Sequence, residues 1–381
     1  MQSIVITRVQ EADYIQRCLK NPVKMIFWEL PSSVKLLNDV VWEQVSCVVV
    51  AIKDKTMRWE IMEWASNYIS DGLILDFWRI YNATIPYRRT DRVLMNPRIS
   101  SFEGLVLGLS HAEVGLISDV FEIPFANLSV SAQDIYYNYK TLKYAVENYH
   151  HKLQNVKYVI IDMFRYTYFN YDASKSRSAL RYYQWSGIFD DAHYFDEEKC
   201  KALKDEIFGK RFEGITEHKL DLWRQVFCDV HQVDDYKDFE TFPTIYRRNQ
   251  VVDDNAVLEY DYNKSIVRKR FDDTIQENIE YFKKMLLLIK ELWPEARITV
   301  LLMPLYELAL KQSESLYDGW KQEFEGIMQE MQKVVEFEYL DYTYHDISKK
   351  KQYWQDFEHL NYPGAICFTQ EINELLFKKT F

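Results

Sequence analysis

The sequence predicts an α/β protein with two domains, each built on a mostly parallel sheet with helices on both faces. Three observations support this prediction. The chain has 381 residues, more than one ordinary domain holds. Short runs rich in Val and Ile alternate with amphipathic segments, as buried parallel strands and crossover helices do. A stretch with Pro86, Pro97 and several arginines, Asn82–Ser101, reads as a linker. We therefore predict domains at 1–92 and 93–381.

The first domain is predicted from four short strands and the helices between them. The strands are Ser3–Thr7, Lys24–Trp28, Cys47–Ile52 and Gly72–Asp76, and the clearest helix is Lys55–Ser70. The pattern resembles the small Rossmann-like modules found on sugar-modifying and polysaccharide-assembly proteins. The turn after the first strand, Thr7–Glu11, contains no glycine, which a dinucleotide fingerprint requires there. We therefore expect no NAD or nucleotide and a structural or partner-binding role.

The second domain repeats the alternation over a longer span. Its predicted strands are Gly104–Leu107, Phe125–Val130, Val156–Met163, Arg297–Met303 and Phe337–Tyr342. Its predicted helices are Ala132–Leu153, Asp273–Trp293, Trp320–Val335 and Gly364–Phe377. Residues 165–263 interrupt the series with a long, aromatic and charged segment that contains no convincing strand. Insertions of this size usually serve as a lid or a binding wall, so we expect a mostly helical insertion within this domain.

Composition and charge exclude several classes of protein. The net charge of −11 argues against a nucleic-acid partner, which would require clustered Lys and Arg. The five scattered cysteines have no CxxC spacing, so we expect neither a disulfide framework nor a zinc ribbon. No segment reads as a signal peptide or a membrane span. These features predict a cytoplasmic protein; they leave its oligomeric state open.

A cluster of glycines surrounds Ser110. The chain has only ten glycines, and Gly104, Gly108 and Gly115 flank the segment Gly108-Leu109-Ser110-His111. Ser110 would lie at a strand-to-helix turn on the carboxyl edge of a parallel sheet, where ligands of open α/β folds bind. The free N–H groups of the helix start could stabilise an oxyanion. A plain helix cap is the alternative role for this serine.

An Asp and a His lie three residues apart near the end of the chain, at Asp356 and His359. A serine hydroxyl needs a base to remove its proton, and a carboxylate that holds the base in the correct tautomer improves it. The pair precedes Leu360-Asn361 and Pro363-Gly364-Ala365. We therefore predict that Ser110, His359 and Asp356 form a catalytic triad, although an isolated Asp-x-x-His on a surface has no role in many proteins.

These segments together resemble the SGNH (GDSL-like) hydrolase superfamily, particularly its divergent branch of polysaccharide acyl-transfer and esterase proteins. The family's second motif block matches Asn127–Ala132, with Ala132 in place of the usual glycine. The resemblance covers roughly residues 100–165 and 270–381. It implies a three-layer, flavodoxin-like parallel-sheet domain in which the N–H groups of Ser110 and Ala132 bind the oxyanion. The family's third block is absent after the strand at 158–163, so a third donor would come from Arg165, Tyr166 or Asn170.

The resemblance implies a serine esterase or acyltransferase acting on an O-acylated carbohydrate, most simply an acetylated one, without metal or organic cofactor. His111, Gln133 and Tyr168 are the candidate substrate-binding residues. The other reading is a weakly active or inactive SGNH-like module that binds a glycan or a partner in surface polysaccharide biosynthesis. Two acidic groups near histidines lack a recognised metal-ligand spacing and read as surface turns: Asp190-Asp191-Ala192-His193, and His231 with Asp234 and Asp235.

Overall fold

The computed structural model contains two compact units. It describes residues 2–20, 22–28, 40–81, 90, 93–94, 96, 98–173, 193, 212, 214–227, 249–261, 269–317 and 319–377. Unit 1 comprises Met1–Arg88 and Leu180–Asp234, and unit 2 comprises Arg89–Ala179 and Asp235–Phe381. The first boundary falls close to the predicted one at 92. The middle of the predicted insertion differs, because Leu180–Asp234 belongs to unit 1 rather than to the second domain.

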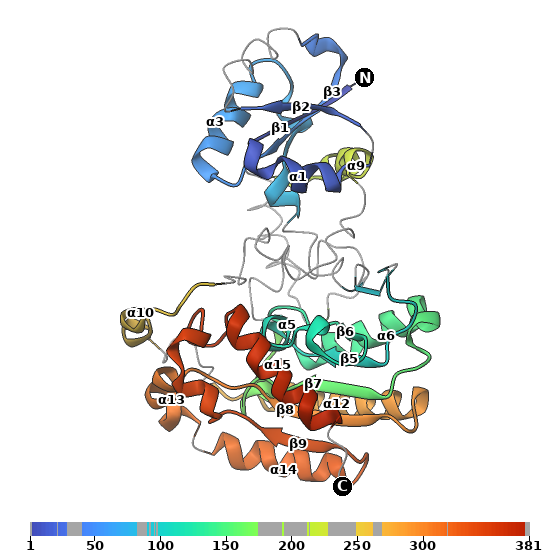
Figure 1. Ribbon diagram of the computed structural model, residues 1–381, viewed down its shortest axis with the longest axis vertical. Helices are drawn as coiled ribbons and strands as arrows, with labels where there is room; N and C mark the ends of the chain where they lie inside the picture. Colours follow the sequence, from blue (N-terminus) through green and yellow to red (C-terminus); the bar gives the residue numbers. More distant parts are fainter. Residues whose placement is uncertain are drawn as a thin grey trace. The chain divides into compact units, whose positions relative to one another are not determined.

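Unit 1 is a small parallel sheet with helices, shown in the blue part of Figure 1. Its strands are β1 (Gln2–Thr7), β2 (Lys24–Phe27), β3 (Val45–Ala51) and β4 (Ile74–Asp76), in the order β2-β1-β3-β4. Helices α1 (Val9–Cys18) and α3 (Lys55–Ala65) connect them, with short 3₁₀ turns η1 (Trp42–Gln44) and η2 (Asp71–Leu73). The Glu11 carboxylate accepts the Lys53 N–H at the end of the sheet, and a negative charge there is unfavourable for a phosphate.

Helix α9 (Glu217–Val226) explains why part of the insertion joins unit 1. The Trp223 ring packs 5.0 Å from the Phe77 ring, and the Lys20 N–H donates to the Val226 carbonyl at 2.9 Å. Burying these aromatic rings gives the sheet a second apolar layer. The part of the insertion that belongs to unit 1 thus contributes α9 to the packing of the first sheet. Its aromatic stretch at 182–185 and most of the acidic groups around residues 190 and 231–235 lie outside the described residues.

Unit 2 is built on a five-stranded parallel sheet. The strands are β5 (Gly104–Leu107), β6 (Phe125–Asn127), β7 (Tyr158–Asp162), β8 (Arg297–Leu302) and β9 (Glu338–Asp341). Their order is β6-β5-β7-β8-β9, and every pairing is parallel. Both sheets of the protein are therefore parallel, and the expected α/β class is confirmed. The Leu, Val and Ile residues of β5, β7 and β8 are buried almost throughout, as central strands covered on both faces require.

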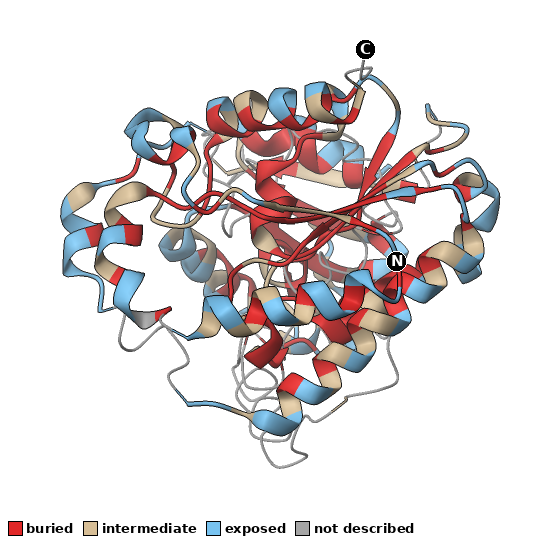
Figure 2. Cartoon of the chain, turned by 90° about the horizontal axis from the view of Figure 1, so that it is seen from below, coloured by how far each residue is buried: buried red, intermediate tan, exposed pale blue. Residues whose placement is uncertain are grey.

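Helices cover both faces of this sheet (Figures 1 and 2). Helix α5 (Ser110–Gly115) packs against α15 (Tyr362–Phe377) on one face. Helices α6 (Ile135–Leu153) and α12 (Asp272–Leu292) pack together on the other. There, α14 (Trp320–Gln332) joins α12, because Phe324 and Phe282 both contact the Phe169 ring. Among the described residues, no helix is both long and apolar enough to cross a lipid bilayer.

Short elements complete the connections of unit 2. They are η3 (Ser118–Val120), η4 (Tyr168–Asn170), α10 (Asp254–Glu259), α13 (Glu307–Ser313), η7 (Glu314–Leu316), η8 (Asp346–Lys349) and η9 (Lys351–Tyr353). Helix α6 begins three residues after the predicted start at Ala132. Ala132 has a left-handed φ of 60°, and the Asp134 carboxylate caps the helix by accepting the Tyr137 N–H at 2.9 Å.

The strand order places a topological switch point at the carboxyl ends of β5 and β7. From β5 the chain passes to β6 on one side, and it then crosses to β7 on the other side of β5. Crossover connections leaving in opposite directions open a space between the two loops, and open α/β proteins bind ligands there. Ser110 follows β5, and the segment Met163–Arg165 follows β7, so both border this point.

Candidate active site

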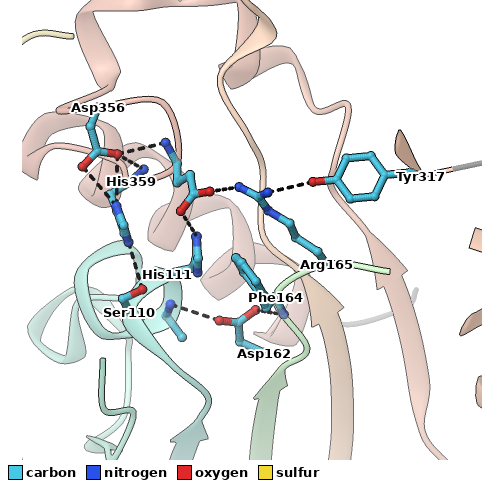
Figure 3. A network of polar contacts seen from close by, with 10 residues as sticks. Ser110, His111, Asp162, Phe164, Arg165, Tyr317, Asp356 and His359 are labelled. Atoms are coloured by element: carbon cyan, nitrogen blue, oxygen red, sulfur yellow. Dashed lines mark hydrogen bonds and ion pairs between the residues drawn. The ribbon is translucent and has the colours of Figure 1, made fainter. Parts of the chain in front are cut away.

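Three polar side chains from distant parts of unit 2 meet at the end of β5 (Figure 3). Ser110 is the first residue of α5. Its Oγ lies 2.9 Å from His359 Nε2, although the two residues are 249 positions apart. His359 Nδ1 lies 3.0 and 3.1 Å from the two carboxylate oxygens of Asp356. The structure thus brings together the three residues that the sequence predicted as a triad, with hydrogen-bond distances at both contacts.

The loop that carries Asp356 and His359 is held by its own polar groups. Asp356 Oδ1 accepts the backbone N–H groups of Glu358 at 2.9 Å and of His359 at 2.8 Å. Asn361 donates to the carbonyls of Gln250 and Gln352, and its Oδ1 accepts the Gly364 N–H at the start of α15. These bonds fix the carboxylate and the imidazole before any ligand arrives.

Opposed influences set the proton affinity of this pair. Burial of the His359 ring favours its neutral form, but the charge and hydrogen bond of Asp356 outweigh burial and raise the pKa of His359 above its ordinary 6.5. Burial likewise acts to raise the pKa of Asp356. The facing His359 and the two backbone N–H donors outweigh it, so the pKa of Asp356 is lowered. Asp356 is therefore an anion beside an imidazole that gains a proton readily.

The turn before Ser110 requires glycine at position 108. Gly108 has a φ of 154°, and a Cβ atom on it would lie 2.7 Å from the Asp162 Cβ. The Asn127 side chain donates to the carbonyls of Ala112 and Leu116 at 2.9 and 2.8 Å, and so holds α5 against β6. The end of β7, where Asp162 lies, can approach the Gly108 turn closely because position 108 lacks a side chain.

Ala132 lies in the loop between β6 and α6, which the sequence resemblance assigned to an oxyanion hole together with Ser110. Its carbonyl accepts the Tyr171 hydroxyl at 2.9 Å. The neighbouring Ser131 Oγ donates to the buried Glu113 carboxylate of α5 at 2.6 Å. The loop is therefore tied to the helix that carries Ser110, and alanine occupies the left-handed conformation in which glycine is favoured.

The predicted substrate-binding residues Gln133 and Tyr168 lie inside the domain. Gln133 is fully buried and Tyr168 nearly so. The Tyr168 hydroxyl donates to the Gln133 carbonyl at 2.7 Å, and Gln133 Nε2 donates to Thr141 Oγ1 at 3.2 Å. Buried groups that bond to each other cannot touch a ligand in this conformation. Both residues instead hold the loop between β6 and α6 in place.

Of the three candidates for a third oxyanion donor, two are engaged elsewhere. The Tyr166 hydroxyl donates to the Asp341 carboxylate at 2.6 Å. Asn170 bridges the Lys269 carbonyl and the Phe271 N–H. Tyr166 and Asn170 therefore hold the backbone together. Arg165 is the one that stays at the site, where its guanidinium pairs with Glu358 and donates to the Tyr317 hydroxyl at 2.8 Å.

His111 lies directly beside the triad. Its ring stacks on the His359 ring at 4.7 Å and contacts the Phe164 ring at 4.5 Å. The residue is 3% exposed, and among the described residues neither ring nitrogen makes a hydrogen bond, while Nε2 lies 3.9 Å from a carboxylate oxygen of Glu358. Burial, and then the neighbouring His359 and Arg165, lower the pKa of His111 well below 6.5. A neutral imidazole therefore forms one wall of the site.

Two groups of described side chains are close enough together to hold a metal ion: His111 with Glu358 and His359, and Asp134 with Asp172 and His193. In the first group, both ring nitrogens of His359 already have partners, and the two rings lie 17° from parallel. A metal must lie in the plane of each ligating ring, which stacked rings do not allow. Asp134 of the second group accepts two backbone N–H groups. In each group, then, at least one residue already uses its candidate ligand atoms in hydrogen bonds within the protein.

Sequence reasoning missed Asp162, Glu358 and Tyr317. Asp162 carried a signal, because it is the one charged residue in an otherwise apolar strand. Glu358 lies between the two predicted triad residues in the sequence and pairs with Arg165. Tyr317, in contrast, lies far away in the sequence, and nothing in its own segment indicates its contact with Arg165.

Comparisons with known proteins add little to this description. No family model matches the chain, and no curated protein matches it in sequence. Among solved structures, the chain is similar to one described as a "putative platelet activating factor from Streptococcus pneumonia". The identity is 10% and the TM-score 0.39, over 85% of this chain and 100% of that chain. A similarity this weak says nothing about function.

Proposed function

We propose that unit 2 is an SGNH-type serine hydrolase domain that acts as an esterase or an acyltransferase. The observation that carries the proposal is the unbroken hydrogen-bond chain from Ser110 Oγ through His359 to the Asp356 carboxylate. A base within 2.6–3.2 Å of the nucleophile, oriented in turn by a third group, is the arrangement that activates a serine hydroxyl. The sequence resemblance described above supports the same family.

In the acylation step, Ser110 Oγ attacks the ester carbonyl carbon while His359 Nε2 accepts the hydroxyl proton. Asp356 keeps the His359 Nδ1–H oriented and stabilises the imidazolium that forms. The tetrahedral intermediate then collapses, the imidazolium returns its proton to the leaving alcohol oxygen, and the acyl group remains on Ser110. Water or a second alcohol, deprotonated by His359, then attacks the acyl-serine and restores the free hydroxyl.

The oxyanion would be bound by the backbone N–H groups of Ser110 and Ala132. Ser110 is the first residue of α5, so its N–H has no partner within the helix. The loop between β6 and α6 is held by the left-handed φ of Ala132 and by the hydrogen bond from the Tyr171 hydroxyl to the Ala132 carbonyl. Preorganised donors of this kind usually supply the largest share of catalysis in acyl transfer.

The substrate class comes from the resemblance alone. It is an O-acylated, most simply O-acetylated, carbohydrate. Arg165 and the His111 ring lie beside the reaction centre and would contact the part of the substrate next to the ester. No resident metal or organic cofactor takes part in the steps above.

One observation favours the second candidate, an SGNH-like module with little or no catalysis. Asn170 and Tyr166, two of the three residues that could replace the missing third donor, bond to other groups. Loss of one oxyanion donor costs on the order of 100–1000-fold in turnover. We rank the hydrolase first because a pure binding module has no need for an aligned serine, imidazole and carboxylate.

Activity measurements separate these candidates. Wild-type protein should hydrolyse p-nitrophenyl acetate and acetylated sugars and react covalently with a fluorophosphonate probe at Ser110. Ser110→Ala should abolish labelling, and His359→Gln should lower turnover by at least about 1000-fold because the serine loses its base. The measurement is initial rate together with intact mass after labelling.

The chain offers a matched control for the histidine variant. His345 Nε2 lies 2.8 Å from Glu371 Oε1, a histidine–carboxylate pair without a serine. His345→Gln should leave turnover and labelling unchanged. Equal inertness of wild type and Ser110→Ala towards every ester and towards the probe would contradict the hydrolase and favour the binding module.

A further inference from the structure

Asp162, the last residue of β7, lies beneath the Ser110 turn (Figure 3). It is fully buried. Its Oδ1 accepts the Phe164 N–H at 2.8 Å, and its Oδ2 accepts the Ala112 N–H at 3.2 Å. The side chain reaches this position because Gly108 has no Cβ to collide with it. One carboxylate thus joins the segments that follow the neighbouring strands β5 and β7.

We propose that Asp162 is the positioning residue of the nucleophile, holding the Ser110 turn by capping α5 from the neighbouring strand. The inference rests on the proposed function for its catalytic consequence. Leu109, the residue before α5, makes no side-chain cap. Ala112, the third residue of α5, has an N–H with no carbonyl partner inside the helix, and a cap normally supplies the acceptor there. Asp162 supplies it across the sheet.

The same carboxylate also shapes the opposite loop. Phe164 has a left-handed φ of 59°, which is rare for a bulky residue, and its N–H is the one that Asp162 Oδ1 accepts. This conformation places the Phe164 ring against His111, which stacks on His359. Asp162 therefore acts on both partners of the proton transfer: on Ser110 through α5, and on His359 through Phe164 and His111.

The charge of Asp162 matters for this role. An ionised carboxylate accepts hydrogen bonds through both oxygens, whereas a protonated one loses part of that capacity. Burial raises the pKa of the Asp162 carboxyl, and the backbone N–H groups of Phe164, Ala112 and Leu109 lower it. Burial has the larger effect, so the pKa is raised to about 7. The elements around Asp162 carry the titratable or charged groups His111, Glu113, Arg165, Tyr168 and His359.

The test compares Asp162→Asn and Asp162→Ala with wild type. Asn keeps one acceptor oxygen but turns an NH₂ towards a backbone N–H, so the turn should loosen. We expect kcat on p-nitrophenyl acetate to fall by on the order of 10–100-fold in Asp162→Asn, and further in Asp162→Ala, with KM within about twofold. The Ala112 amide should exchange with solvent faster, while amides of β8 stay protected.

Leu286→Ala in the α12 core is the matched control, because it removes a fully buried side chain away from the turn. It should lower stability and leave kcat unchanged. A wild-type kcat in Asp162→Asn, with Ala112 still protected, would overturn the proposal. If wild type itself shows no turnover, the hydrolase assignment fails, whereas amide exchange still decides whether Asp162 holds the turn.

A measurement on wild type covers the case in which the variants do not fold. The Ala112 and Phe164 amides should both exchange slowly with solvent, because each donates to the Asp162 carboxylate. Rapid exchange of either amide would contradict a carboxylate that holds both segments.

Discussion

At the scale of single residues, His359 is the general base of the proposed hydrolase, and its raised pKa has a measurable consequence. A general base works only when it is unprotonated, so the rate should fall as pH drops through its pKa. Since Asp356 raises that pKa above 6.5, we expect the acidic limb of kcat/KM to have its midpoint above pH 6.5. Profiles of kcat/KM against pH measure this directly.

Replacing Asp356 tests the origin of that midpoint. In Asp356→Asn, the largest influence that raises the pKa of His359 is gone and burial of the ring remains, so the midpoint should move to lower pH. The maximal rate should also fall, on the order of 1000–10,000-fold, because the imidazole loses the group that holds its tautomer. An unchanged midpoint would show that Asp356 does not set the basicity of His359.

At the scale of elements, the loop between β6 and α6 stores strain at a single alanine. A non-glycine residue in the left-handed region costs about 1–2 kcal/mol, and Ala132 has a φ of 60°. Ala132→Gly should therefore raise the free energy of unfolding by up to about 1 kcal/mol while leaving kcat unchanged, since the N–H remains. Urea unfolding measures the gain, and a clear loss of stability would show that the alanine methyl contributes packing that outweighs the strain.

The elements of unit 2 were largely predictable because hydrophobic periodicity reports burial. Strand β5 was predicted at its observed bounds, and α12 to within a residue at each end. The segments around Ser110 and around Asp356 could be located because rare residue types recur at short spacing there. The Asp162 contacts could not, because its partners are backbone N–H groups, which leave no trace in sequence. Helix α13 is too short to show a helical period.

At the scale of the whole molecule, the two units have separate cores, and the candidate site draws on unit 2 alone. Ile6→Ala in the core of unit 1 removes a fully buried side chain, which costs about 2–5 kcal/mol. We expect this cost in the thermal unfolding of unit 1, with labelling of Ser110 at 25 °C unchanged. Calorimetry and fluorophosphonate labelling test the two halves of the prediction. A parallel loss of labelling would show that unit 1 supports the site.

The separation of 249 positions between Ser110 and His359 also has a consequence for biosynthesis. A ribosome adds about 5–20 residues per second, so the serine leaves it on the order of 10–50 seconds before its imidazole partner. Throughout that interval the hydroxyl is chemically ordinary. In the proposed hydrolase, a nascent chain therefore has no complete triad until synthesis has passed His359, and a chain that ends before that residue lacks the base that activates Ser110.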